Sequence, residues 1–241
     1  MERRTLTESE RLDWLRLIRS ENVGPITFHR LLERYGTAGR ALEALPELAR
    51  RGGRAKPLTL CPKGEAEREM AGAARLGARL LASCEPDYPA LLAAVDDAPP
   101  IVTLRGHAVL LSRRCVAIVG ARNASLNGRK LAEAFARDLG AAGFTVVSGL
   151  ARGIDTAAHA GSLQSGTVAV LAGGVDIVYP PENRRLYDDL CAQGAVVAES
   201  PLGAEPTARH FPRRNRLISG LSLGVVVVEA ARQSGSLITA R

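Results

Sequence analysis

The chain has 241 residues, 46% of them hydrophobic, which is enough for one α/β core and a smaller second domain. Its net charge of +7 favours a polyanionic partner such as nucleic acid, although the basic residues are spread along the whole chain. Four cysteines without a C-x-x-C pair argue against a zinc site and a disulfide framework. No secretory leader or apolar run of about 20 residues is present, so we expect a cytoplasmic protein without a membrane partner.

Residues 7–50 are predicted to form a helical unit. Thr7 and Glu10 have the spacing of a capping box, and apolar residues then recur at helical spacing. The turn at 22–27 resembles a helix-hairpin-helix module, in which backbone N–H groups can bind a DNA phosphate. A helical hairpin used only for packing or for docking a partner fits the same residues. A loop rich in glycine and proline follows at 51–64.

A domain boundary is expected near Cys84, where an extended, proline-containing passage begins. Beyond it, short β-branched runs alternate with helical stretches. Buried parallel strands are predicted at 101–104, 115–119, 144–148, 167–171, 195–199 and 224–228. Helices are predicted at 125–139, 154–163, 183–191 and 212–221. This alternation predicts an α/β fold: a Rossmann-like, doubly wound, mostly parallel sheet at 85–241, preceded by a small all-helical domain at 1–84.

The loop after the second of these strands is a candidate anion site, because ligands of such sheets bind at the carboxyl ends of the strands. Gly120 lets the chain leave the strand, Ser125 can cap the next helix, and Ala121 and Arg122 lie between them, forming a plausible phosphate cradle. The G-x-G-x-x-G and Walker A patterns are absent, which argues against hydride transfer and ATP hydrolysis. A capped turn with a solvated arginine is the alternative.

A second glycine loop follows the next strand. Gly149 and Gly153 lie on either side of Arg152, a pattern that favours a backbone nest with N–H groups free to hold an anion. Two such loops side by side strengthen the case for an anionic ligand. The loop at 172–183, which follows the third strand, could line the wall of the same pocket or be purely architectural.

The segment 209–220 combines four arginines and a histidine with Phe211 at the start of a predicted helix. Phosphate charge beside a stacking ring suits single-stranded DNA, although Phe211 could instead be a core anchor. The predicted DNA-binding residues of this segment are Phe211, Arg213, Arg214, Asn215 and Arg216. After the last strand, Ser234, Gly235 and Ser236 resemble a further helix-opening anion loop.

Together these motifs resemble the DNA-processing protein A (DprA/Smf) family. The motifs are GAR at 120–122, SGLARGID at 148–155, GG at 173–174, FPRRNRLISG at 211–220 and SGSLITA at 234–240. The resemblance is strong over 85–241 and weaker over 10–80, where many members carry a helical, sterile-alpha-motif-like domain. Members often have serine where this chain has Ala121, and the family pattern continues past residue 241, often into a winged-helix domain.

The resemblance implies a function that spacing alone does not. Members bind and protect single-stranded DNA and help to load RecA recombinase during natural transformation, usually as homodimers. Carried over, Arg122 and residues 211–216 would contact DNA. Neither a catalytic site nor a cofactor is implied.

Two other functional classes remain as alternatives. Phosphoribohydrolases of the same superfamily use a P-G-G-x-G-T-x-x-E loop, which this chain lacks; Glu199 or Glu229 would have to take the acidic role. Asp155 and His159 lie four residues apart on a predicted helix and could form an acid/base pair, although a structural hydrogen bond is the preferred interpretation. The other alternative is a scaffold whose arginine loops bind an acidic protein. Salt-dependent binding to bare oligonucleotides would distinguish a DNA-binding protein from such a scaffold.

Overall fold

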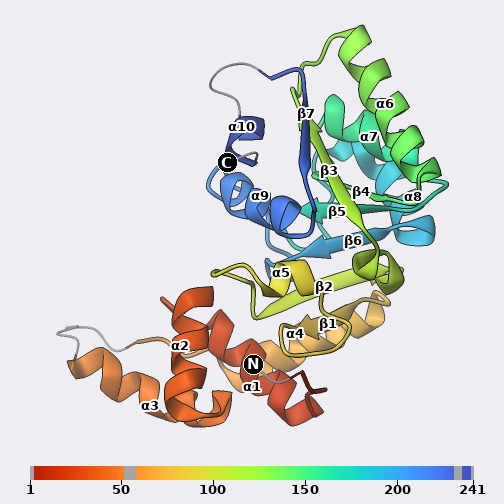
Figure 1. Ribbon diagram of the computed structural model, residues 1–241. Helices are drawn as coiled ribbons and strands as arrows, with labels where there is room; N and C mark the ends of the chain where they lie inside the picture. Colours follow the sequence, from red (N-terminus) through yellow and green to blue (C-terminus); the bar gives the residue numbers. More distant parts are fainter. Residues whose placement is uncertain (1–2, 52–57, 231–234, 240–241) are drawn as a thin grey trace.

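The computed structural model describes residues 3–51, 58–230 and 235–239, and its centre is a seven-stranded sheet with the order β1-β2-β6-β5-β4-β3-β7 (Figure 1). The strands are β1 (Arg79–Ala82), β2 (Ile101–Gly106), β3 (Cys115–Gly120), β4 (Thr145–Ser148), β5 (Thr167–Leu171), β6 (Ala195–Ala198) and β7 (Val225–Val228). The helices are α1 (Glu8–Arg19), α2 (Pro25–Tyr35), α3 (Ala38–Arg51), α4 (Lys63–Arg75), α5 (Ala90–Ala93), α6 (Leu126–Ala141), α7 (Ile154–Ser162), α8 (Arg184–Gln193), α9 (His210–Gly220) and α10 (Gly235–Thr239). Two 3-10 helices are η1 (Ala108–Ser112) and η2 (Pro181–Asn183).

The mostly parallel, doubly wound sheet is confirmed. Strands β6, β5, β4, β3 and β7 pair in parallel, and crossover helices join those that follow one another along the chain. The prediction of a parallel strand at 101–104 is wrong, because β2 is antiparallel to both β1 and β6. Only η1 lies between β2 and β3, which is too short for a crossover helix, and a strand buried on both faces has the same apolar run in either direction.

Helices cover both faces of the sheet. In Figure 1, α6, α7 and α8 lie on one side and α9 and α10 on the other. Alternate residues of each strand supply the two cores: Ile118 of β3 packs with α6 and α7, whereas its neighbours Ala117 and Val119 pack with α5 and α9. The described part of β7 is an edge strand, and its first three valines are only half-buried, contrary to the expectation of a fully buried strand.

The helical unit begins as predicted. Thr7 and Glu10 form the capping box, with the Thr7 amide donating to the Glu10 carboxylate at 2.8 Å. In its core, Trp14 and Phe28 make an edge-to-face contact with ring centroids 5.0 Å apart. The α2 helix starts after Gly24, so the turn at 22–27 does join two helices.

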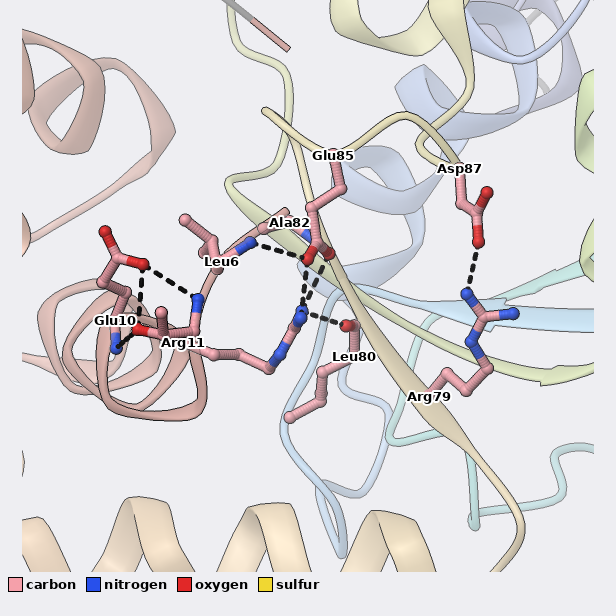
Figure 2. A network of polar contacts seen from close by, with 9 residues as sticks. Leu6, Glu10, Arg11, Arg79, Leu80, Ala82, Glu85 and Asp87 are labelled. Atoms are coloured by element: carbon pink, nitrogen blue, oxygen red, sulfur yellow. Dashed lines mark hydrogen bonds and ion pairs between the residues drawn. The ribbon is translucent and has the colours of Figure 1, made fainter. Parts of the chain in front are cut away.

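A partly buried ion pair connects this helical unit to the sheet (Figure 2). Arg11 of α1 binds the Glu85 carboxylate through both terminal nitrogens, at 2.8 and 2.6 Å, and donates to the Leu80 carbonyl. Glu85 also accepts the amides of Leu6 and Ala82, so it fills most of its acceptor positions. One carboxylate therefore holds the entry to α1 against the turn after β1.

Strand β1 was not predicted, because its sequence, Arg-Leu-Leu-Ala, has no β-branched residue and follows α4 after a single turn. It lies just before Cys84, and the division of the chain near that residue stays a prediction. Among the described helices, none has the length and apolar character needed to span a membrane.

Candidate nucleic-acid interface

The loops that follow β3, β4 and β5 surround a pocket of about 510 Å³, a volume that includes open solvent. We call it the aromatic pocket. Its charged and aromatic lining residues are Arg122, Arg152, Tyr179, Phe211 and Arg214. The remaining lining is mostly apolar or backbone, the composition that ligand pockets at the switch point of a parallel sheet have.

A row of one cation and two rings forms the mouth of the aromatic pocket. The Arg122 guanidinium lies 4.8 Å from the centre of the Phe211 ring, and the Tyr179 ring centre lies 5.7 Å from that of Phe211. Tyr179 is 45% exposed, and Phe211 is half-buried and lies in none of the hydrophobic core clusters of the described residues, so Phe211 is not a core anchor. Sites for single-stranded nucleic acid combine positive charge with accessible aromatic rings in this way.

Tyr179 was missed among the predicted contact residues. It lies in the 172–183 loop, directly before Pro180 and Pro181, and this loop does line the pocket wall. The available signal was an aromatic residue in a stiff loop after a buried strand, where a core role for the ring is less expected.

In the first glycine loop, which follows β3, a carboxylate of the protein binds at the N-terminus of α6. Ser125 caps α6 by accepting the Gly128 amide, as predicted, but its own amide and hydroxyl donate to the carboxylate of Glu229 at 2.7–3.0 Å. Hydrogen bonds from the Ser125 side chain and backbone lower the pKa of Glu229. The predicted phosphate cradle therefore holds a protein carboxylate at Ser125. Ala121 and Arg122 lie beside it, and Arg122 is exposed.

In the second glycine loop, which follows β4, backbone amides are also bound by a carboxylate of the protein. The amides of Gly149 and Ala151 donate to the buried Asp155 carboxylate at 3.1 and 3.3 Å, so the expectation of N–H groups free for an anion is wrong at these two positions. Arg152 projects from the loop, exposed, and pairs with Glu182. Gly153 has a φ of +77°, and a Cβ there would lie 2.3 Å from the Ala121 carbonyl, so it permits the two loops to touch.

Asp155 and His159 do not form an acid/base pair. His159 Nδ1 instead contacts the Thr167 hydroxyl at 2.9 Å. Asp155 and His159 are both buried. Burial raises the pKa of Asp155, against the lowering effect of Arg214 and the loop amides. Burial lowers the pKa of His159 to about 3, and Arg214 adds to the lowering. Both are structural groups beneath the site.

The segment from Phe211 to Arg216 divides between the surface and the interior. Arg214 is 7% exposed and donates to the carbonyls of Gly149 and Val170 at 2.6 and 2.7 Å; burial lowers its pKa. Arg216 binds Glu199 at 2.6 Å and the Asp97 carbonyl at 2.5 Å. The Asn215 amide donates to the Gly235 carbonyl. Three of the predicted contact residues thus hold the protein together, and Arg213 is exposed beside Glu199.

The last predicted loop is partly described. Ser234 lies outside the described residues. Gly235 begins the five-residue α10, and the Ser236 hydroxyl donates to the Gly120 carbonyl at 2.8 Å. This bond joins α10 to the end of β3, so Ser236 has a structural contact at the site.

The structure brings most of the predicted residues to one edge of the sheet. Gly149, Arg152, Phe211, Arg122 and Arg214 line the aromatic pocket. Gly120, Ala121, Asn215, Gly235 and Ser236 line an adjoining hollow, which Arg122, Phe211 and Arg214 also line. Ser125, Gly153, Arg213 and Arg216 line neither.

No group of three or more histidine, cysteine, aspartate or glutamate side chains in the described ranges could hold a metal ion. Glu199 is engaged by Arg213 and Arg216, and Glu229 by Ser125, so both acidic candidates for hydrolysis have intramolecular partners.

Comparison with known proteins places this geometry in a family. The protein-family model "DNA recombination-mediator protein A" matches residues 79–241, and the family model "DprA-like N-terminal HHH domain" matches residues 8–72. Protein Smf of Synechocystis is 33% identical over 98% of this chain and 62% of its own length. DNA processing protein DprA of Streptococcus pneumoniae is 45% identical over 63% of this chain and 54% of its own length. The chain thus spans about half the length of the curated relatives it matches.

Two solved structures are similar as well. The X-ray structure of DNA processing protein A from Streptococcus pneumoniae has a TM-score of 0.75 and 33% identity, over 98% of this chain and 82% of that one. The protein of the same name from Helicobacter pylori has a TM-score of 0.64 and 26% identity, over 69% of this chain and 75% of that one. The latter structure was described for its single-stranded DNA binding mode.

Proposed function

The chain belongs to the DNA recombination-mediator protein A family, and on this premise we propose that it binds single-stranded DNA at the aromatic pocket. The observation that carries the proposal is the row formed by the exposed Arg122 and Tyr179 with the half-buried Phe211 between them. A base can stack on the rings while the guanidinium contacts a phosphate, and a base paired within a duplex has no face free for stacking. Arg152, which is exposed and paired with Glu182, also lines the pocket.

We further propose the wider role that the family resemblance implies. Bound to the strand in the cytoplasm, the protein helps to load a RecA-type recombinase during natural transformation, acts as a homodimer and carries out no catalysis of its own. Family membership supports the role in recombinase loading. The proposal that the protein carries out no catalysis is supported by the intramolecular partners of Glu199 and Glu229, the two acidic candidates for hydrolysis.

Fluorescence anisotropy with single- and double-stranded oligonucleotides over a salt series tests the DNA proposal. Arg122→Ala should weaken single-strand binding for all sequences alike and lower the slope of log K against log salt by about 0.7, the value for one lost phosphate contact. Arg137→Ala is the matched control, because Arg137 is an exposed arginine near the other end of α6.

The other outcomes each have a meaning. Equal loss in both variants would indicate diffuse electrostatic attraction rather than a site. No binding by the wild-type protein at low salt would overturn the proposal, and hydrolysis of nucleoside monophosphates would then be measured. The recombinase role is tested separately, by the rate at which a RecA-type protein assembles on the strand with and without this protein.

A further inference from the structure

A groove between the helical unit and α9 adjoins the aromatic pocket. Its volume is about 940 Å³ with open solvent included, and we call it the α1–α9 groove. Its lining from the helical unit is Ile18, Arg19 and Val23, and its lining from the sheet side includes Glu199, His210 and Arg213. Leu171, Ala172 and Arg214 line both this groove and the aromatic pocket. The two hollows are therefore contiguous across the end of β5.

The rim of the groove offers hydrogen-bond donors. The side chain of Arg213 is 55% exposed. His210 Nδ1 accepts the Thr207 amide at 3.2 Å, so in the neutral ring the proton is on Nε2, which is left as a donor. Glu199, the one carboxylate of the lining, is bound by both Arg213 and Arg216, and Arg216 also pairs with Asp97. Arg19 is paired with Glu69 at 2.8 Å. The donors that remain on the rim for a phosphate are therefore those of the exposed Arg213 side chain and of His210 Nε2.

The floor of the groove is apolar. Ile18 and Val23 come from the helical unit, and Leu171 and Leu217 come from the sheet and from α9. Donors over an apolar floor match a nucleotide, whose phosphate needs the former and whose sugar and base can cover the latter. An acidic peptide would use the donors but would gain less from the floor.

We propose that the α1–α9 groove holds the next part of the same DNA strand, so that the helical unit forms one wall of the binding site. The strand would leave the aromatic pocket past Ala172 and Arg214 and continue between α1 and α9. This inference rests on the proposed function, because the aromatic pocket must hold the first nucleotide. In this proposal the helical hairpin contributes to DNA binding through Ile18 and Val23, which line the groove.

The test is the dependence of affinity on oligonucleotide length. Oligothymidylates from about 3 to about 12 nucleotides would be titrated by anisotropy against the full chain. Arg213→Gln should leave the affinity for the shortest binding oligomer within about twofold and remove severalfold of the gain seen with longer ones. Arg209→Gln is the matched control, because Arg209 is an exposed arginine just before α9 and lines neither hollow.

Photo-cross-linking supplies an independent readout. An oligothymidylate with 5-iodouracil at successive positions should form adducts at His210 or in the peptide that contains residues 18–23, at positions next to those that label Tyr179 or Phe211. Adducts confined to Tyr179 and Phe211 would overturn the proposal, as would an Arg213→Gln effect that does not depend on length. Absence of binding at every length by the wild-type protein would instead overturn the proposed function itself.

Discussion

The carboxylate of Glu229 occupies the N-terminus of α6 by accepting both the amide and the hydroxyl hydrogen of Ser125. Glu229 has a φ of +53°, which is rare for a residue with a side chain, and it comes directly after β7. A helix N-terminus beside an exposed arginine is where a phosphate is also stabilised. Under the proposed function, Glu229 would therefore compete with a DNA phosphate for the positive charge at this helix N-terminus.

The first prediction concerns this competition. Glu229→Gln should raise the affinity for single-stranded DNA at low salt by up to about fivefold, with the difference disappearing as salt is increased. Anisotropy over a salt series measures both quantities. Asp138→Asn, a matched loss of one exposed carboxylate near the far end of α6, should have a smaller effect. Equal effects of the two variants would mean that DNA does not approach Ser125.

A second prediction separates stacking from packing at Phe211. Phe211→Ala should weaken DNA binding by about 1–3 kcal/mol, because a base loses its stacking partner. The free energy of unfolding should change little, because the ring is half-buried and its ring contacts are with Arg122 and Tyr179. Phe211→Leu keeps an apolar side chain without the aromatic face and should still bind poorly. A large loss of stability with unchanged affinity per folded molecule would restore the core-anchor interpretation.

The third prediction uses two adjacent arginines with opposite environments. Arg214→Met should destabilise the protein by about 2–4 kcal/mol, because two buried carbonyls lose a charged donor and Asp155 loses a nearby positive charge. Arg213→Met should change stability by less than about 1 kcal/mol, since the Arg213 side chain is 55% exposed and Glu199 keeps its ion pair with Arg216. Urea unfolding of the two variants measures the difference. Similar losses would show that Arg214 is not the structural member of the pair.

The sequence predicted the sheet well where burial and β-branching coincide, as in β3 and β5, and placed the glycine loops at the correct edge. The direction of β2 could not be predicted, because an apolar run looks the same for a parallel and an antiparallel strand. The loops' own carboxylates, Asp155 and Glu229, were not recognised as their occupants, because those contacts depend on how the turns fold. Arg214 could have been recognised as internal: with Leu217, Ile218 and Leu221 it lies on the buried face of α9, at the spacing of an apolar stripe.

The fourth prediction is a pH dependence of stability from His159. The Thr167 hydroxyl donates to the Val146 carbonyl, so His159 Nδ1 must donate to Thr167, and Nε2, which is buried and without a partner among the described residues, carries no proton. The pKa of His159 is about 3 in the folded state and near its ordinary value when unfolded, so the unfolded state binds more protons between these values. Stability should therefore fall by roughly 1.4 kcal/mol per pH unit as the pH drops below about 6.

Urea unfolding of the wild type and of His159→Gln from about pH 7 to about pH 5 tests this dependence. The variant keeps an amide donor for Thr167 and cannot titrate, so the stability difference between the two proteins should shrink as the pH falls. A difference that stays constant over this range would mean that His159 is protonated in the folded protein or is not buried in solution.

The last prediction concerns the ion pair that joins the helical unit to the sheet (Figure 2). Burial alone would raise the pKa of Glu85, but the Arg11 hydrogen bonds and the amides of Ala82 and Leu6 lower it overall. The stabilisation is thus present above the ordinary glutamate pKa and is lost as the pH falls through the lowered value. Glu85→Gln should cost about 1–3 kcal/mol at neutral pH, because the partly buried Arg11 is left without an anion. The double variant Glu85→Gln/Arg11→Met should cost clearly less than the sum of the two single variants in urea unfolding, whereas additive losses would show that the two side chains do not stabilise each other.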